Sequence, residues 1–165
     1  MRTIDNINSL NKSEFLSIFG NVFEKTESVA LKVFELKPFK DSDDIVSKML
    51  KIYEEYDRDK ILQILNSHPE LAIEKKLTNE SKLEQTSANL NECSEEEFEE
   101  FKKLNLEYKK KFGFPFIIAV KGKNKNEILV NFRERIQNDL NKEFLEAKNQ
   151  VKKIASLRLK DILSF

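Results

Sequence analysis

Tryptophan is absent from this chain of 165 residues, and glycine, proline, cysteine and histidine are all scarce. Three glycines and three prolines are too few for the many tight turns of a β-sandwich or barrel, so the composition favours helices. A single cysteine, Cys93, cannot form an internal disulfide, which suits a reducing compartment. With one histidine and one cysteine, the chain lacks the usual ligand set for zinc or iron, and we expect no bound metal.

The chain also lacks a net charge, because 29 Lys and Arg residues balance 29 Asp and Glu residues. This balance gives no global electrostatic argument for binding nucleic acid or an anionic membrane surface. No stretch approaches the roughly 18 apolar residues of a membrane span, and the start "MRTIDNINSLNKSEF" has no apolar leader segment. We therefore expect a cytoplasmic protein with neither nucleic-acid nor membrane partners.

The sequence does have helical periodicity along most of its length. In "SEEEFEEFKKLNLEYKKKF", Ser94 and Glu97 match a capping box, apolar residues recur at helical spacing, and Gly113 follows the last turn. Gly20 is likewise expected to end an early helix in a left-handed conformation. Helices are predicted over 14–19, 26–36, 45–56, 61–65, 81–90, 94–112, 126–137 and 142–163.

The segment "FPFIIAV" is short, apolar and partly β-branched, which is typical of a strand. A lone strand would have no partner in this chain, so we predict an extended buried connector over residues 113–120. The thirteen phenylalanines should fill much of the core. The prediction is one all-α domain over residues 1–165 with about eight helices.

The only histidine lies in "LNSHPELA". A residue before proline disfavours the α conformation, so the preceding helix should stop by Ser67 or His68, and Pro69 suits the first turn of a new helix. That placement puts His68 near a helix N-terminus, whose partial positive charge favours a neutral imidazole. His68 is then either an acid/base group or merely a cap of the helix.

Further polar residues have both a structural and a functional interpretation. Arg158 falls on the apolar stripe of the last predicted helix, so its guanidinium must be paired or open to a wet cleft. The structural interpretation is a snorkelling arginine or an internal ion pair, and the functional one is an anion site. Ser81 and Glu84 match a capping box, which by itself makes Glu84 structural. Gln85 either offers its amide to a polar ligand or is a solvated helix residue, and Arg135 is expected in an ion pair or an interface.

Four segments together resemble one enzyme family. They are "LNSHPELA", "LTNESKLEQTSANL", "LNLEYKKKFGFPFIIAVKGKNKNEIL" and "EAKNQVKKIASLRLKDIL", in that order. They resemble the 2-oxo-4-hydroxy-4-carboxy-5-ureidoimidazoline (OHCU) decarboxylases, and "FLSIFGNVFEKTESVALKVFELKPFKD" resembles the opening of that family. The resemblance covers nearly the whole chain, and "KFGFPFIIAVKGK" is its most specific part.

The resemblance implies an all-helical enzyme, usually a homodimer, that catalyses the last step from urate to (S)-allantoin without metal or organic cofactor. The catalytic histidine, glutamate and arginine of the family match His68, Glu84 and Arg158. The resemblance further implies substrate-binding residues in the His-Pro, Glu-Gln and "FGFPF" regions, which are Pro69, Gln85, Phe114, Pro115, Phe116 and Ile118.

Two departures from the family pattern concern the rim of the expected pocket. The connection "ELAIEKKLTN" after His68 is short and has no glycine, and Asn89 follows Ala88 where the family commonly has Ala-Gly. Two other functions therefore stay open. One is a non-catalytic helical adaptor for a partner protein, and the other is a diverged relative that binds another small ureido or carboxylate compound.

Overall fold

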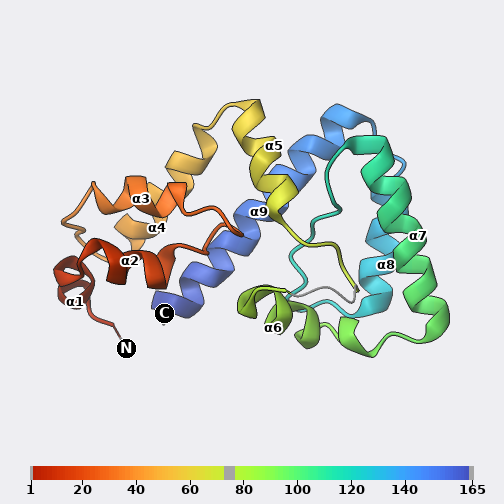
Figure 1. The fold of residues 1–165 in the computed structure, drawn as a ribbon, viewed down its shortest axis with the longest axis horizontal. Coiled ribbons are helices and arrows are strands. Elements are labelled where there is room, and N and C mark those ends of the chain that lie inside the picture. Colours follow the sequence, from red (N-terminus) through yellow and green to blue (C-terminus); the bar gives the residue numbers. More distant parts are fainter. Residues whose placement is uncertain (1, 73–76, 164–165) are drawn as a thin grey trace. The chain divides into compact units, whose positions relative to one another are not determined.

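The computed structural model describes residues 2–72 and 77–163, and no β-strand occurs within these ranges. Nine α-helices and one short 3-10 helix occur in them (Figure 1). They are α1 (Ile4–Ser9), α2 (Lys12–Phe19), α3 (Ser28–Phe34), α4 (Ser42–Glu54), α5 (Arg58–Ser67), α6 (Asn79–Ser87), η1 (Leu90–Glu92), α7 (Glu95–Phe112), α8 (Lys125–Arg135) and α9 (Leu140–Leu163). The prediction of an all-α protein is confirmed.

The chain divides into two compact units. Unit 1 comprises Met1–Ser67 and Lys152–Phe165, and unit 2 comprises His68–Val151. The long helix α9 supplies residues to both units. The prediction that residues 1–165 form one domain stays a prediction, and each unit is described by itself below.

In unit 1, α3 packs against both α2 and α4 (Figure 1). The core between them is rich in phenylalanine, as the composition predicts. The ring of Phe15 lies 4.6 Å from that of Phe19, 5.5 Å from that of Phe34 and 6.0 Å from that of Phe39, measured between centroids. Such aromatic pairs stabilise a core beyond the area that they bury.

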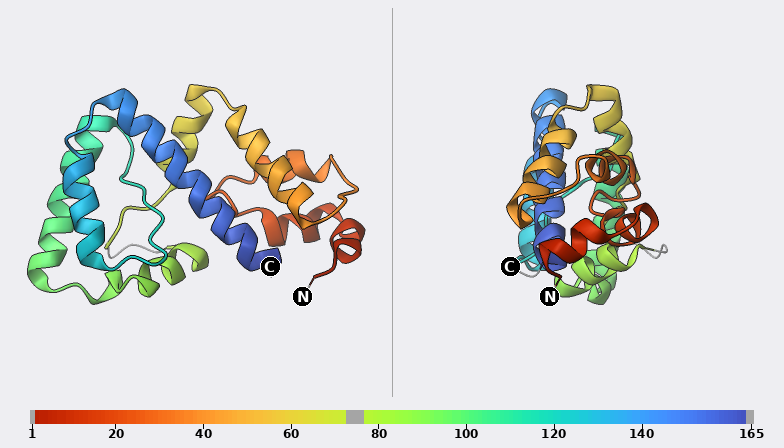
Figure 2. Two further views of the ribbon diagram at one scale, coloured as in Figure 1. Left: turned by 180° about the vertical axis from the view of Figure 1, so that it is seen from behind. Right: turned by 90° about the vertical axis from the view of Figure 1, so that its left-hand side faces the viewer.

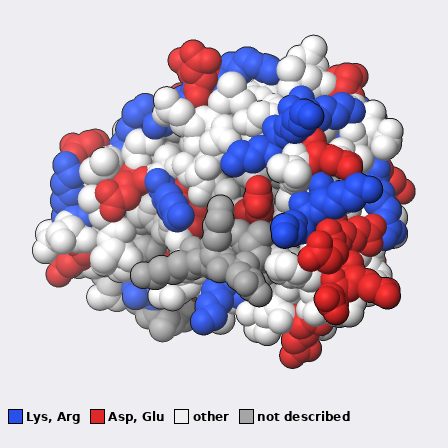
Figure 3. All heavy atoms as spheres, turned by 45° about the vertical axis from the view of Figure 1, so that its right-hand side comes forward, with Lys and Arg blue, Asp and Glu red and all other residues white. Residues whose placement is uncertain are grey.

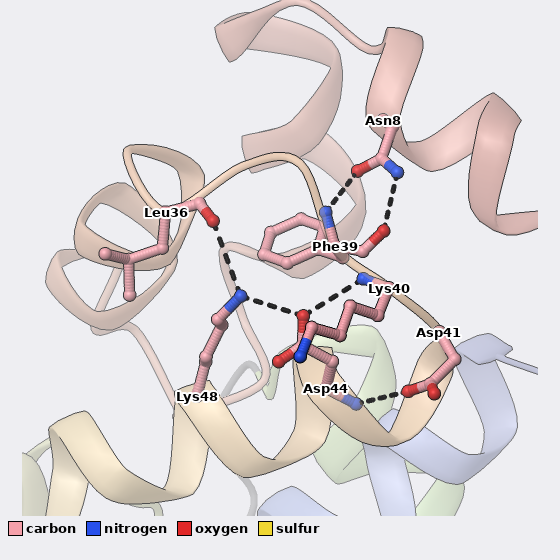
Figure 4. A network of polar contacts seen from close by, with 7 residues as sticks. All are labelled: Asn8, Leu36, Phe39, Lys40, Asp41, Asp44 and Lys48. Carbon is pink, nitrogen blue, oxygen red and sulfur yellow. Dashed lines mark hydrogen bonds and ion pairs between the residues drawn. The ribbon is translucent and has the colours of Figure 1, made fainter.

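Side chains of two helices fix the loop before α4 (Figure 4). The Asn8 side chain accepts a hydrogen bond from the Phe39 amide at 2.7 Å and donates one to the Phe39 carbonyl at 2.8 Å. The Asp44 carboxylate accepts from Lys48 Nζ at 2.8 Å and from the Lys40 amide at 3.0 Å. The hydrogen bond from Lys48, followed by that from Lys40, lowers the pKa of the Asp44 carboxyl.

Two local predictions at the start of the chain were incomplete or wrong. Helix α1 was not predicted, although Thr3 and Asn6 form a reciprocal capping box at its start. Gly20 follows α2 with a right-handed φ of −64°, so the predicted left-handed cap is wrong. A Cβ atom at Gly20 would instead meet the carbonyl oxygen of Leu16. Close approach to the backbone, and not a positive φ, requires glycine there.

In unit 2, α7 and α8 lie side by side (Figures 1 and 2). The capping box of Ser94 and Glu97 is confirmed, and Gly113 ends α7 with a left-handed φ of 81°, as predicted. Residues 115–120 form neither helix nor strand and are buried, as predicted for the connector. Phe116 in this connector stacks on Phe132 of α8, with centroids 3.9 Å apart.

Buried tyrosines should make the protein less stable at alkaline pH. Burial raises the pKa of Tyr53 and of Tyr108 above the usual value of 10.0, and a hydrogen bond to Glu143 contributes at Tyr108. The unfolded chain loses these protons near pH 10, whereas the folded protein keeps them to higher pH. Their stabilisation is therefore complete below about pH 10 and declines as the pH rises.

We expect urea unfolding to show this decline, with Tyr53→Phe making it shallower by up to about 1.4 kcal/mol per pH unit. The comparison is between the pH dependence of the unfolding free energy in wild type and variant. Identical slopes in the two proteins would contradict a raised pKa at Tyr53.

Candidate active site

His68 directly follows α5, whose end at Ser67 confirms the predicted helix stop. Its side chain is buried, with 8% of the residue surface exposed. Residues 69–72 are not helical, and the next described helix, α6, begins at Asn79. The predicted helix starting at Pro69 is therefore wrong. Neither the capping role of His68 nor the argument from a helix N-terminus applies to this residue.

Buried amides hold the backbone after the His-Pro pair, which explains why it does not continue as a helix. Gln85 Nε2 donates to the Glu70 carbonyl at 3.2 Å, and Gln85 Oε1 accepts from the Ala72 amide at 3.1 Å. Asn105 Nδ2 donates to the Leu71 carbonyl at 3.0 Å. Both amide side chains are buried. We call Gln85 and Asn105 the amide clamp.

The amide clamp holds Ala72 in an unusual conformation. Ala72 has a φ of 53°, in the left-handed region that a residue with a Cβ seldom adopts. This conformation costs about 1–2 kcal/mol relative to the right-handed one. Backbone strain of this kind persists where surrounding contacts determine it, and it is concentrated at functional sites. The strained residue lies four positions after His68 in the sequence.

Glu84 lies on α6, next to Gln85, and its side chain is half-buried. The N-cap of α6 is Thr78, whose side chain accepts from the Ser81 amide at 3.3 Å. Ser81 is therefore a buried residue of the first turn, and the predicted capping box of Ser81 and Glu84 is wrong. The capping explanation for Glu84 is removed, and its catalytic role stays a prediction.

Asn89, which stands where the family commonly has glycine, adopts a backbone conformation that glycine also adopts. Asn89 has φ 59° and ψ 24°, in the left-handed region, at the start of η1. Asparagine visits this region more readily than other residues with a side chain. The other departure, the connection after His68, includes residues 73–76, which lie outside the described residues.

We expect Asn89→Val to destabilise the protein by about 1 kcal/mol or more, because a β-branched residue is strained at positive φ. Asn89→Gly should not destabilise it, since glycine adopts this conformation freely. Asn91, exposed in η1, gives the matched control, and Asn91→Val should stay within about 0.5 kcal/mol of wild type. Urea unfolding measures all three. Equal effects of valine at both positions would contradict the conformational argument.

The connector carries the predicted substrate-binding residues Phe114, Pro115, Phe116 and Ile118, and all four are buried. Its backbone is tied to side chains on two helices. Arg135 Nη1 donates to the Ile117 carbonyl at 2.7 Å, and Gln150 Oε1 accepts from the Ala119 amide at 2.9 Å. These bonds fix the path of the connector, and its contact with substrate stays a prediction.

Arg135 belongs to a buried network inside unit 2. Its Nε donates to Glu143 Oε1 at 2.7 Å, and Tyr108 donates to the same oxygen at 2.6 Å. Asn138 donates to Glu143 Oε2 at 3.0 Å. The ion pair predicted for Arg135 is confirmed. Glu143 was not singled out from the sequence, although it directly precedes Phe144 on the buried stripe of α9.

Arg158 is buried on α9, as its position on the apolar stripe predicts. In unit 1, its Nη2 donates to Glu24 Oε2 at 2.7 Å and its Nη1 donates to the Asn21 carbonyl at 2.9 Å. Glu24 is fully buried and was not found from the sequence. Of the two interpretations of Arg158, the ion pair is present. Its action together with His68 and Glu84 on one substrate stays a prediction.

Among residues 2–72 and 77–163, no group of three or more His, Cys, Asp and Glu side chains is arranged to hold a metal ion. Within the same ranges, no helix has the length and apolar character needed to cross a membrane. Figure 3 shows one face on which basic and acidic side chains are interspersed.

The fold matches two solved structures closely. A crystal structure of (S)-allantoin synthase has a TM-score of 0.78 at 26% sequence identity, over 98% of this chain and 54% of that chain. A crystal structure of OHCU decarboxylase in the presence of (S)-allantoin has a TM-score of 0.74 at 25% identity, over 88% of this chain and 97% of that chain. The chain thus has the all-helical fold of these enzymes.

Sequence comparison places the chain within one family. It is 35% identical over 98% of its length to the 2-oxo-4-hydroxy-4-carboxy-5-ureidoimidazoline decarboxylase of Haloferax volcanii, covering 96% of that protein. It is 38% identical to the uric acid degradation bifunctional protein of Bacillus sp. (strain TB-90), spanning 32% of that longer protein. The sequence model of the OHCU decarboxylase family matches residues 8–160. The chain belongs to the OHCU decarboxylase family.

Proposed function

We propose that this chain decarboxylates OHCU to (S)-allantoin in urate degradation, as a carbon–carbon lyase that needs no cofactor. The observation that carries the proposal is the match to the OHCU decarboxylase family over residues 8–160. The chain also keeps the histidine, glutamate and arginine of the family motifs as His68, Glu84 and Arg158.

The substrate explains why no cofactor is needed. Its carboxylate is attached to a carbon that also bears a hydroxyl, in a ring with conjugated C=N and C=O groups. When the carbon–carbon bond to the carboxylate breaks, carbon dioxide leaves and the electron pair is delocalised into this ring. A proton then adds to the adjacent ring carbon, which carries the ureido group, and the hydroxyl loses its proton to become the ring carbonyl of allantoin. The ring itself accepts the electrons that pyridoxal or thiamine would otherwise accept.

The protein supplies positioning and proton transfer in this proposal. Arg158 holds a carboxylate or ring oxygen through the parallel N–H groups of its guanidinium. His68 exchanges a proton with the hydroxyl or the ring, and Glu84 orients the substrate or the imidazole. Protonation from one face gives the S product. The proposed substrate contacts are Pro69, Phe114, Pro115, Phe116 and Ile118. Both ends of the Gln85 amide bind the backbone of Glu70 and Ala72, so Gln85 is not included among them.

Two further parts of the proposal concern assembly and location. We propose that the chain acts as a homodimer in the cytoplasm, as the resemblance to the family implies. The exposed apolar side chains on unit 2 include Leu83 on α6 and Leu106 on α7. Sedimentation of the purified protein measures the oligomeric state directly.

The test of the function is to add purified protein to freshly generated OHCU and follow circular dichroism for one allantoin enantiomer. Rapid formation of the S enantiomer is the expected result, and EDTA should leave the rate unchanged. Racemic allantoin at the uncatalysed rate would contradict the proposal. Activity that EDTA removes and a divalent cation restores would show a carboxylate metal site.

A diverged relative that binds another ureido or carboxylate compound is the second candidate. The short connection after His68 favours it, because this segment differs from the usual family pattern. The left-handed Asn89 weakens the case, since that departure leaves the backbone conformation unchanged. A helical adaptor is the third candidate, and it predicts no turnover of OHCU.

A further inference from the structure

We propose that the amide clamp, Gln85 and Asn105, positions the catalytic histidine by fixing the backbone of residues 70–72. This inference rests on the proposed function, because it assigns these two residues a role in placing the His68 imidazole. Gln85 and Asn105 are thus positioning residues, and neither needs to touch the substrate. Gln85 was predicted to bind substrate, whereas Asn105 was given no role in the reaction.

Hydrogen bonds join the amide clamp to the backbone of residues 70–72. Three successive residues after the His-Pro pair bind the clamp through one backbone group each. These groups are the Glu70 carbonyl, the Leu71 carbonyl and the Ala72 amide. Both clamp side chains are at least nine-tenths buried, and the bonds to Leu71 and Ala72 are buried, so water does not compete for these two bonds. Loss of either side chain would leave a backbone group without its present partner in a buried place.

Glutamine is chemically suited to position 85. A backbone carbonyl needs a donor and a backbone amide needs an acceptor, and glutamine provides both on one neutral group. Gln85 uses its two ends in this way on Glu70 and Ala72. A carboxylate or an ammonium group could satisfy only one of the two, and each would bring a buried charge.

The route from the clamp to His68 is short and stiff. Pro69 stands between His68 and Glu70, and its ring fixes one of the two backbone torsions there. Gln85 also neighbours Glu84 on α6, so one helix carries both the clamp and the second predicted catalytic residue. The hydrogen bonds of Gln85 therefore fix the position of the backbone after the His-Pro motif relative to α6, which carries the Glu-Gln motif.

The strained residue Ala72 allows a decisive test. If Gln85 acts by holding Ala72 in its left-handed conformation, glycine at that position should reduce the need for Gln85, because glycine adopts this conformation without strain. If Gln85 acts by touching the substrate, Ala72→Gly should not alter the loss of activity that replacing Gln85 causes.

The experiment is a double-mutant cycle on the full chain with OHCU as substrate. We expect Gln85→Leu to lower kcat about tenfold in the wild-type background and only two- to threefold in the Ala72→Gly background, with KM changed less than about twofold. Asn105→Leu should behave in the same way.

Gln150→Leu is the matched control, because Gln150 is also buried and also accepts from a backbone amide, that of Ala119. Its effect on kcat should be equal in the two backgrounds. An equal loss from Gln85→Leu in both backgrounds, or a raised KM with unchanged kcat, would overturn the proposal. If Gln85→Leu fails to fold, Gln85→Glu enters the same cycle, because it keeps the acceptor for Ala72 and removes the donor to Glu70.

Hydrogen exchange at the Ala72 amide separates this proposal from the proposed function. We expect protection in the wild type and faster exchange in Gln85→Leu. Unchanged exchange would overturn the clamp even in an active enzyme. A wild-type protein that lacks OHCU decarboxylase activity would instead refute the proposed function, and exchange would still decide whether the clamp holds Ala72.

Discussion

Replacing His68 with asparagine is expected to lower kcat for OHCU by about 100-fold or more, the usual scale for losing a positioned acid or base. Asparagine is polar and similar in size, but it cannot transfer a proton near neutral pH. Since residues 69–72 are not helical, the substitution removes no helix cap. The melting temperature should therefore change little. Steady-state kinetics and thermal unfolding measure the two effects separately.

The control for this substitution is Asn66→Ala, on the exposed surface of α5 close to His68 in the sequence. It should leave both kinetics and melting near those of wild type. The His68→Asn variant should also release allantoin with reduced enantiomeric excess, because protonation in solution has no preferred face. Near-normal turnover with a single enantiomer would exclude His68 as the proton-transfer group and assign that role to Glu84.

Glu143→Leu is expected to destabilise the protein by about 3–5 kcal/mol, because it leaves the buried Arg135 guanidinium without its carboxylate partner. Tyr108 and Asn138 lose their acceptor in the same substitution. For a chain of this size, the melting temperature should fall by roughly 10 °C. Urea and thermal unfolding measure the change.

An exposed ion pair of the same chemistry provides the comparison. Arg133 Nε donates to Glu100 Oε1 at 2.7 Å, and both side chains are partly open to solvent. Glu100→Leu should therefore cost less than about 1 kcal/mol. Similar losses from Glu143→Leu and Glu100→Leu would mean that the buried network stabilises the fold no more than a surface ion pair does, contrary to this prediction.

The candidate catalytic residues could be named from the sequence because they stand in family motifs, and their action at one site stays a prediction. His68, Glu84 and Arg158 each stand in a family motif, and the apolar stripe of α9 independently singled out Arg158. The buried partners of Arg158 and of the backbone after His68 could not be predicted in this way. Glu24 and Asn105 are ordinary polar residues in the sequence, and only their burial and partners distinguish them.

The sequence by itself determined the features that depend on neighbours along the chain. Helical periodicity, the capping box of Ser94 and the glycine at position 113 defined α7, because each acts within a turn or two. The sequence offers no partner strand for residues 113–120, and this predicted a connector there. The family motifs then gave the proposed chemistry.

Only the tertiary structure decided which polar groups meet across long stretches of chain. Arg158 pairs with Glu24, 134 positions away, and Asn105 bonds to Leu71, 34 positions away. Buried contacts also overrode a local signal at Pro69, because Gln85 and Asn105 bind the backbone of residues 70–72 where a helix was predicted, and Ala72 is left-handed. Local preferences differ by only about 1 kcal/mol per residue, so a few buried hydrogen bonds between distant residues suffice to reverse them.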